Sequence, residues 1–328
     1  MTALRAPGAR LLADVGGTNA RFAWQPAAGA AIGDVIVLPC ADHATLADAI
    51  ATYLGRLGRG TPSECAIAIA NPVTGDQVRM TNHHWAFSIS ALEAQCGFER
   101  LRVLNDFTAL ALALPSLPRD ELRQVGGEAP VPGTAIALIG PGTGLGVSGL
   151  LPDGRGGWVP LQGEGGHATL AGRTAREQAV LQQLDFQYGH ASGERAISGQ
   201  GLIDVYQALQ AIDAPRQPRR EINAAQIVQG ALEHDNAACL EALDLFCAFL
   251  GTAAGNLALT LGARGGVYIG GGIVPRLGDA FDSSPFRSRF EAKGRFKAYL
   301  ASIPVFVIDA RQSPALLDAA AALDHNFD

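Results

Sequence analysis

Lysine is almost absent from this chain, and its absence excludes two well-known ways of binding phosphate. Lys293 and Lys297 are the only lysines among 328 residues, and neither follows a glycine. A Walker loop requires Gly-Lys-Ser/Thr, and a protein kinase requires a lysine on an early strand. If the protein binds a phosphorylated ligand, it must do so with other donors.

Three further features are scarce or missing. The five cysteines are scattered and form no C-x-x-C pair (Cys40, Cys65, Cys96, Cys239 and Cys247), which predicts a reduced compartment and no structural zinc. The net charge of −6 is spread without blocks, which argues against nucleic acid or an anionic membrane as partner. No apolar N-terminal segment with a basic flank is present, so we expect no secretion signal and a cytoplasmic location.

Charge is also missing from Leu245–Ala263, which contains the spacing Gly251-x-x-x-Gly255. The length would suffice to cross a bilayer. Because Thr, Asn and Gly dilute the stretch and it stands alone in the chain, we expect a buried helix in a large core and not a transmembrane span.

Glycine-rich turns between apolar strands occur twice. "LLADVGGTNARFAW" places the turn Gly16–Asn19 between two strands, and "AIALIGPGTGLGVSGL" places Gly140–Gly144 in the same way. Both are typical of hairpins, and the repetition suggests two related α/β halves. A third strand followed by glycines occurs in Gly265–Leu277.

The remaining periodicity predicts an α/β protein with a helix-rich second half. The Pro-rich segment Glu128–Gly133 is the best candidate for a linker, so we expect a small α/β domain over residues 1–132 and a large one over 133–328. The predicted helices are Thr45–Leu57, Arg173–Tyr188, Gly201–Gln210 and Asn223–Leu232, and further strands are expected at Cys65–Ala70 and Val305–Ile308.

The two Gly/Thr turns are suited to phosphate, because they offer unobstructed backbone N–H groups and a hydroxyl. A single such turn would be read as ordinary hairpin geometry, but two matched turns favour a ligand. Asp14 lies in the first strand beside its turn. It could hold Mg²⁺ directly or through water, or it could accept N–H groups of the turn.

A dinucleotide site is a weaker alternative. Gly144-x-Gly146-x-x-Gly149 matches G-x-G-x-x-G, and Glu164 follows at a suitable distance. That fingerprint must open a helix, and the segment after it is too rich in Gly and Pro to form one.

Polar side chains stand in Gly-rich or otherwise exposed settings at several places, including Asn105-Asp106, Glu164 with His167, and Glu194. Acids, amides and an imidazole together suit a polyhydroxylated ligand. With His190, the two glutamates and His167 could instead ligate a metal, as in a metal-dependent hydrolase. Gly165-Gly166 disfavours that alternative, because it prevents the helical spacing that would place Glu164 and His167 on one face.

Asp106 lies between a short strand, Leu101–Leu104, and an apolar helix that is expected to begin at Phe107. An ionised carboxylate is costly there unless something stabilises it. It could accept the proton of a sugar hydroxyl during phosphoryl transfer, or it could be only the N-cap of the helix.

Seven ordered blocks, from "LLADVGGTNARFAW" through "MTNHHWAFSI", "LNDFTALALALP", "GPGTGLGV", "GEGGHATLA" and "ERAISGQGL" to "GGVYIGGGIVPRL", resemble the bacterial ATP-dependent glucokinases of the hexokinase/actin-like ATPase superfamily. The resemblance implies two ribonuclease-H-like lobes of mixed sheets flanked by helices, with an interlobe cleft. It also implies glucose and Mg²⁺–ATP as substrates, a homodimer, and a C-terminal helix that could pack on the small domain. The zinc-binding cysteine cluster of the related repressor/kinase family is missing after "GEGGH".

The resemblance also implies residue roles. Asp106 is the general base, and glucose hydroxyls are bound by Asn105, Asp106, Glu164, His167 and Glu194. The nucleotide is bound by Ala13, Asp14, Val15, Gly16, Gly17 and Thr18 in the first phosphate loop, by Gly142, Thr143 and Gly144 in the second, and by Gly270, Gly271 and Gly272 near the nucleoside. No resident metal site is implied.

Two positions depart from the family pattern. Asp318 and Pro141 both stand where a small residue is usual.

The function we expect is transfer of the ATP γ-phosphoryl group to the 6-hydroxyl of glucose in glycolysis. A non-catalytic sugar-sensing regulator on the same fold is the alternative, disfavoured because only ten residues precede Leu11 and leave no room for a DNA-binding helix-turn-helix. Selectivity among hexoses stays open.

Overall fold

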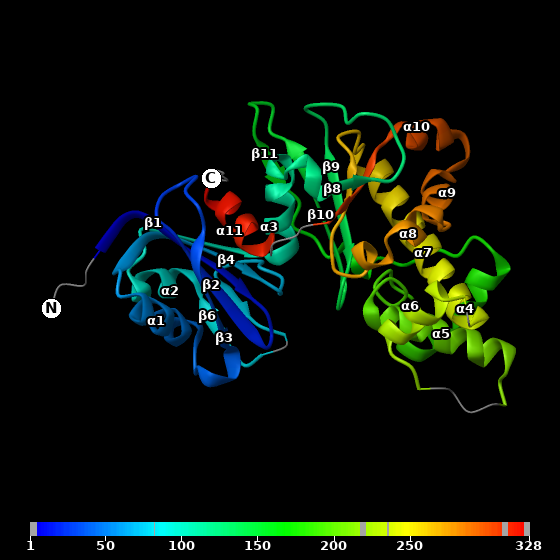
Figure 1. Ribbon diagram of the computed structural model, residues 1–328, viewed down its shortest axis with the longest axis horizontal. Coiled ribbons are helices and arrows are strands. Elements are labelled where there is room, and N and C mark those ends of the chain that lie inside the picture. Colours follow the sequence, from blue (N-terminus) through cyan, green and yellow to red (C-terminus); the bar gives the residue numbers. More distant parts are fainter. Residues whose placement is uncertain (1–4, 82, 217–220, 235, 310–313, 325–328) are drawn as a thin grey trace. The chain divides into compact units, whose positions relative to one another are not determined.

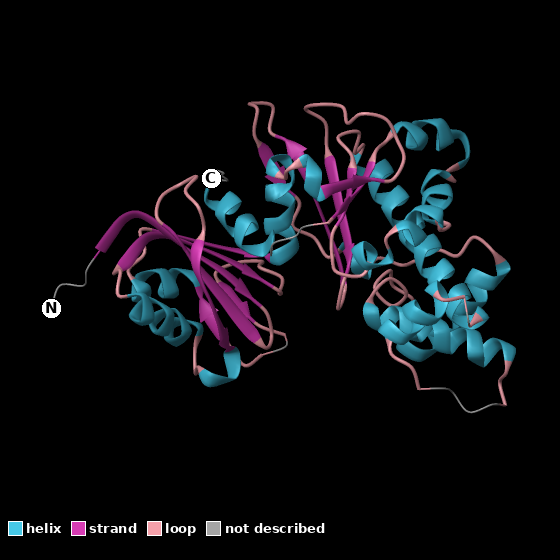
Figure 2. Ribbon diagram, viewed as in Figure 1, coloured by secondary structure: helices cyan, strands magenta, loops and turns pink. Residues whose placement is uncertain are grey.

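The computed structural model describes residues 5–81, 83–216, 221–234, 236–309 and 314–324. Asn82, within the quoted "MTNHHWAFSI", therefore lies outside the described residues. The chain forms two compact units, shown in Figures 1 and 2. The first comprises residues 1–117, 153–162 and 310–328, and the second comprises 118–152 and 163–309. Each unit is described by itself.

The first unit is built on a five-stranded sheet in the order β3-β2-β1-β4-β7. β1 and β2 form the antiparallel hairpin expected around the first Gly/Thr turn, and β1, β4 and β7 run parallel. The strand bounds are β1 Arg5–Val15, β2 Asn19–Gln25, β3 Gly33–Pro39, β4 Thr61–Ile69 and β7 Arg100–Asn105. β5 Gln77–Arg79 and β6 Ala86–Ser88 form a separate two-stranded pair, and β11 spans Trp158–Pro160.

Helices cover both faces of this sheet. α1 (Leu46–Leu57) and α2 (Ile89–Cys96) share a buried core with Leu11, Ala13 and Val15 of β1. Because side chains alternate along a strand, Asp14 belongs to the opposite face. The helices α3 (Asp106–Ala113) and α11 (Pro314–Asp324) pack against one another, and α11 also packs against β1 and β4. The C-terminal helix thus packs within the first unit.

The second unit is built on five sheet strands in the order β10-β9-β12-β13-β8. β9 and β10 form the second predicted hairpin. The strands are β8 Leu122–Gln124, β9 Ile136–Pro141, β10 Leu145–Pro152, β12 Val267–Ile269 and β13 Val305–Ile308. The helices are α4 Ala175–Tyr188, α5 Gly199–Asp213, α6 Ala224–Leu232, α7 Ala237–Leu261, α8 Asp279–Ser283, α9 Phe286–Glu291 and α10 Lys297–Ser302.

The uncharged stretch that begins at Leu245 lies in α7, the one helix in the described part of the chain whose length and composition could cross a membrane. In its most apolar window 67% is buried inside the protein, which supports the prediction of a core helix. A Cβ on Gly251 would meet the Phe286 carbonyl oxygen, and one on Gly255 would lie 2.6 Å from the Phe290 carbonyl oxygen. The glycine spacing therefore lets α9 approach the backbone of α7.

The division between the units differs from the expected boundary at residue 132. The chain enters the second unit after Leu117, because β8 pairs with β13 there. Glu128–Gly133 is not a linker between the units. The Glu128 N–H donates to the Ser302 carbonyl at 3.0 Å and the Val131 N–H to the Arg264 carbonyl at 3.0 Å, so this Pro-rich segment is attached within the second unit.

Candidate active site

Asn105 and Asp106 lie at the junction of β7 and α3. The Asn105 side-chain oxygen accepts the N–H groups of Phe107 at 3.0 Å and Thr108 at 3.3 Å. The N-cap of α3 is therefore Asn105, and the alternative that Asp106 is merely an N-cap is wrong. Asp106 is instead the first helical residue, where the positive end of the helix dipole stabilises a carboxylate.

The Asp106 carboxylate has an unusual proton affinity. Burial is the main cause that raises its pKa to about 6. The hydrogen bond from the Phe107 N–H, 2.8 Å from Oδ1, lowers the pKa, and the nearby Asp14 carboxylate raises it. A carboxylate with a pKa near 6 is ionised at neutral pH yet more basic than an ordinary aspartate, which is what general-base catalysis requires.

Asp14 stands near the end of β1, beside the first Gly/Thr turn. Burial raises its pKa, and Arg21, whose Nη1 lies 3.7 Å from Oδ2, lowers it. The Gly16 N–H closes the turn on the Asn19 carbonyl at 3.0 Å. Within the described residues, the N–H groups of Gly17 and Thr18 donate to no other group, so both are available to an anionic ligand.

Asp318 shares the α3 side of the first sheet with these acids. It is 3% exposed, and its Oδ1 has no hydrogen-bond partner in the described structure. Burial raises its pKa well above the usual range, and the Asp14 and Asp106 carboxylates raise it further. Burial of this kind favours the protonated, neutral form of the carboxyl group.

The second Gly/Thr turn is joined to a predicted sugar contact in the second unit. The Leu145 N–H donates to Glu194 Oε2 at 3.0 Å. A Cβ on Gly144 would collide with that same carboxylate, so a larger residue there would have to displace the Glu194 side chain. The structure thus brings Gly144, Leu145 and Glu194 together from segments far apart in the sequence.

Glu164, His167 and Glu194 also form one cluster. His167 lies 4.0 Å from Glu164 through Nε2 and 4.0 Å from Glu194 through Nδ1. The Glu194 N–H donates to the Gly166 carbonyl at 2.8 Å, and this fixes the two loops against each other. The fourth member of the proposed metal set does not join them, because His190 Nε2 instead lies 2.9 Å from Thr169 Oγ1.

The third glycine segment follows β12. The Gly270 N–H donates to the Ile139 carbonyl at 3.0 Å. Gly271 has a φ of +78°, and a Cβ there would collide with the Pro141 carbonyl oxygen. Pro141, which departs from the family pattern, is the buried last residue of β9. The glycine turn after β12 packs against it. The run Gly144–Gly149 lies in the turn and β10 and opens no helix, which removes the dinucleotide alternative.

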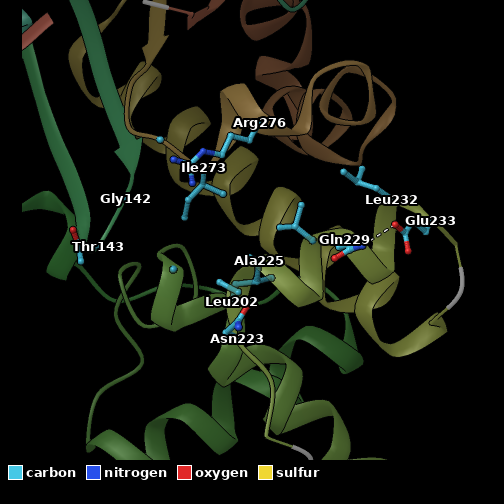
Figure 3. Close-up of a pocket in the computed structure, with 14 residues that line it drawn as sticks. Gly142, Thr143, Leu202, Asn223, Ala225, Gln229, Leu232, Glu233, Ile273 and Arg276 are labelled. Atoms are coloured by element: carbon cyan, nitrogen blue, oxygen red, sulfur yellow. Dashed lines mark hydrogen bonds between the residues drawn. The ribbon is translucent and has the colours of Figure 1, made fainter. Parts of the chain in front are cut away.

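A cavity of about 970 Å³ in the second unit brings two of these turns together (Figure 3). Gly142 and Thr143 line it beside Gly272. Within the described residues, the N–H groups of Thr143 and Gly144 donate to no other group. The rest of the lining comprises Gly199, Leu202, Asn223, Ala224, Ala225, Val228, Gln229, Leu232, Glu233, Ile273 and Arg276. This arrangement offers phosphate donors on one side and an apolar wall for a planar group on the other.

Most of that lining was not identified from the sequence. The helix Asn223–Leu232 was predicted, but periodicity alone does not reveal which of its faces borders a cavity. Arg276 stood within a quoted motif without a role. Its signal was that it is an arginine four residues after Gly272 in a chain with almost no lysine.

Comparison with known proteins gives a consistent result. A family model described as Glucokinase matches residues 11–326. A glucokinase of Chromobacterium violaceum is 54% identical over 317 residues, covering 96% of this chain and 90% of its own. A protein of Burkholderia pseudomallei named Bifunctional protein glk is 54% identical over 319 residues. The match covers 97% of this chain and 49% of that protein, so this chain spans about half of that relative's length.

The fold comparison agrees. A crystal structure of a glucokinase from an Antarctic psychrotroph matches with a TM-score of 0.86 at 35% identity, covering 96% of this chain and 98% of that one. The mixed sheets flanked by helices are those of the actin-like ATPase fold that the motifs predicted.

Proposed function

This chain belongs to the glucokinase family, and on that premise we propose that it transfers the γ-phosphoryl group of Mg²⁺–ATP to the 6-hydroxyl of glucose with Asp106 as the general base. The observation that carries the proposal is the setting of Asp106. Its carboxylate stands at the end of β7, and its pKa is raised to about 6. The N-cap of α3 is Asn105, so the Asp106 side chain is not required to cap the helix.

The reaction needs one proton acceptor and one leaving group. The Asp106 carboxylate accepts the proton of the 6-hydroxyl as the sugar oxygen attacks the γ-phosphorus. The new O–P bond forms, the bond between the γ-phosphorus and the β–γ bridging oxygen breaks, and ADP leaves with the electron pair. Asp106 returns its proton to solvent after release of glucose 6-phosphate.

The sugar is assigned to Asn105 and Asp106 and to the cluster of Glu164, His167 and Glu194. Carboxylate pairs accept hydrogen bonds from adjacent hydroxyls, and the imidazole can donate or accept. The 4.0 Å separations within the cluster support this role, because they leave room for a ligand oxygen to bridge the side chains.

The nucleotide is assigned to the glycine turns. The free N–H groups of Gly17, Thr18, Thr143 and Gly144 suit phosphate oxygens, with Ala13, Asp14, Val15 and Gly16 shaping the first turn. The cavity beside Gly272 accommodates the nucleoside. The family resemblance further leads us to propose a cytoplasmic homodimer acting in glycolysis, which size-exclusion chromatography with light scattering and cell fractionation would test.

A coupled assay with ATP, Mg²⁺ and a panel of hexoses tests this function directly. We expect glucose 6-phosphate and ADP in equal amounts. Sugar binding measured by calorimetry without any turnover would instead support the sugar-sensing regulator. If the protein neither bound nor phosphorylated any hexose, both the glucokinase and the regulator hypotheses would be contradicted.

A further inference from the structure

The cavity of the second unit has a charge pattern that the assigned residues do not explain. Glu233 and Arg276 are the only charged side chains among its described lining. Glu233 already accepts a hydrogen bond from Gln229 Nε2 at 2.9 Å. Arg276 is exposed, and in the part of the chain that the structure describes its guanidinium has no ion pair and no side-chain hydrogen bond.

The position of the guanidinium is set by the glycine segment. Arg276 lies in the 3₁₀ turn Val274–Leu277, and its N–H donates to the Ile273 carbonyl at 3.1 Å. Its Nη2 lies 4.0 Å from the point that a Cβ on Gly272 would occupy. In Figure 3 the side chain extends toward Ile273 and away from Gln229 and Leu232. The charge therefore stands over the glycine end of the cavity.

Three other cations of the second unit have partners outside the cavity lining. Lys293 Nζ donates to the Thr252 carbonyl at 3.0 Å and to Asn256 Oδ1 at 2.5 Å. Arg287 pairs with Glu291, and Arg289 with Glu177. A triphosphate bound at the Thr143 turn would meet neutral N–H donors and, among the lining residues, only one fixed positive charge.

We propose that Arg276 binds the phosphate chain of the nucleotide at the glycine end of this cavity. The inference rests on the proposed function, because it assumes that the cavity accepts a nucleotide. A guanidinium can bind two phosphate oxygens at once through its planar fork. The apolar wall formed by Leu202, Ala225 and Val228 then holds the base, so charge and stacking act at opposite ends of the ligand.

Binding of ATP, ADP and adenosine, measured by calorimetry, tests this assignment. We expect Arg276→Gln to weaken ATP and ADP about tenfold to hundredfold, the usual worth of a charge-assisted hydrogen bond, and to leave adenosine and glucose unchanged. Arg276→Lys, which keeps the charge but loses the fork, should recover part of the loss. Arg264→Gln is the matched control, because Arg264 is also exposed in the second unit but does not line the cavity.

The outcomes separate the two levels of the argument. Equal weakening of ATP, ADP and adenosine by Arg276→Gln would show that the guanidinium contacts the nucleoside, and would overturn the phosphate assignment. Unchanged binding of all three would overturn it as well. If the unmodified protein bound no nucleotide, the assignment of this cavity to a nucleotide would be wrong, and so would the proposal that ATP is the phosphoryl donor.

Discussion

The side-chain Oδ1 atoms of Asn105 and Asp106 both lie within hydrogen-bond distance of one backbone N–H, that of Phe107, at 3.0 and 2.8 Å. Asn105 also accepts from Thr108, so it caps α3 without help. The carboxylate of Asp106 is consequently replaceable without loss of the helix start, which makes its chemistry separable from its structure.

Asp106→Asn should therefore lower kcat by about 10²–10⁴-fold, the usual contribution of a general base, while glucose binding and the fold persist. An amide keeps an oxygen that can accept the Phe107 N–H, but it cannot accept the 6-hydroxyl proton at neutral pH. The coupled assay gives kcat, and calorimetry gives the glucose affinity. Asp120→Asn is the control, because Asp120 is an exposed acid outside these clusters. Wild-type turnover in Asp106→Asn would remove this residue from the chemistry.

The pH dependence of kcat/KM for glucose should report the same carboxylate. Because its pKa is raised to about 6 and the base must be ionised, kcat/KM is expected to fall about tenfold per pH unit below 6 and to level off above it. The residual rate of Asp106→Asn should lack this inflection. An inflection near 4 in the unmodified protein would mean that burial does not perturb the working carboxylate.

Asp318→Asn is expected to stabilise the protein at pH 8. The folded-state pKa of Asp318 lies well above its ordinary value, so the folded protein is favoured while this group is protonated and loses stability as pH rises from about 4 toward the folded-state pKa. The amide carries no charge and escapes that loss. The gain in unfolding free energy, measured with urea, should therefore grow from pH 4 to pH 8.

The control for this comparison is Asp185→Asn, on the exposed face of α4, which should shift stability little and equally at both pH values. A gain for Asp318→Asn that is the same at pH 4 and pH 8 would indicate a packing effect and no titration of the buried carboxyl.

Gly144→Ala should raise the KM for glucose roughly tenfold, a shift on the scale of one lost hydrogen bond to a charged group. The new methyl would occupy the place of the Glu194 carboxylate and displace it from the Leu145 N–H. Gly163→Ala, which has open space around its Cβ position, is the control and should leave KM unchanged. If Gly144→Ala altered only the KM for ATP, Glu194 would not be a sugar contact.

Local patterns predicted the elements well where side-chain chemistry defines their ends. Thr45 and Thr174 form capping boxes at α1 and α4, and β13 occupies the residues expected for it. The family motifs placed the three glycine segments described above. The signals were strong because turns and caps are determined by residues only a few positions apart.

Long-range contacts were not predictable in this way. Glu128–Gly133 has the composition of a linker, yet its N–H groups pair with carbonyls of the second unit. That Asp318 is buried beside two other acids follows from the packing of α11, which periodicity does not reveal. The unused charge of Arg276 likewise became visible only when the helix Asn223–Leu232 and the third glycine segment were found on the same cavity.

The close approach of α9 to α7 has a consequence for the durability of the protein. Gly251 and Gly255 let a short helix cover part of an uncharged surface that has the length and composition of a membrane span. A thermal opening that lifts α9 would expose this surface to other copies, and we expect self-association to compete with re-docking. Heat inactivation should therefore be irreversible and governed by the rate of that opening.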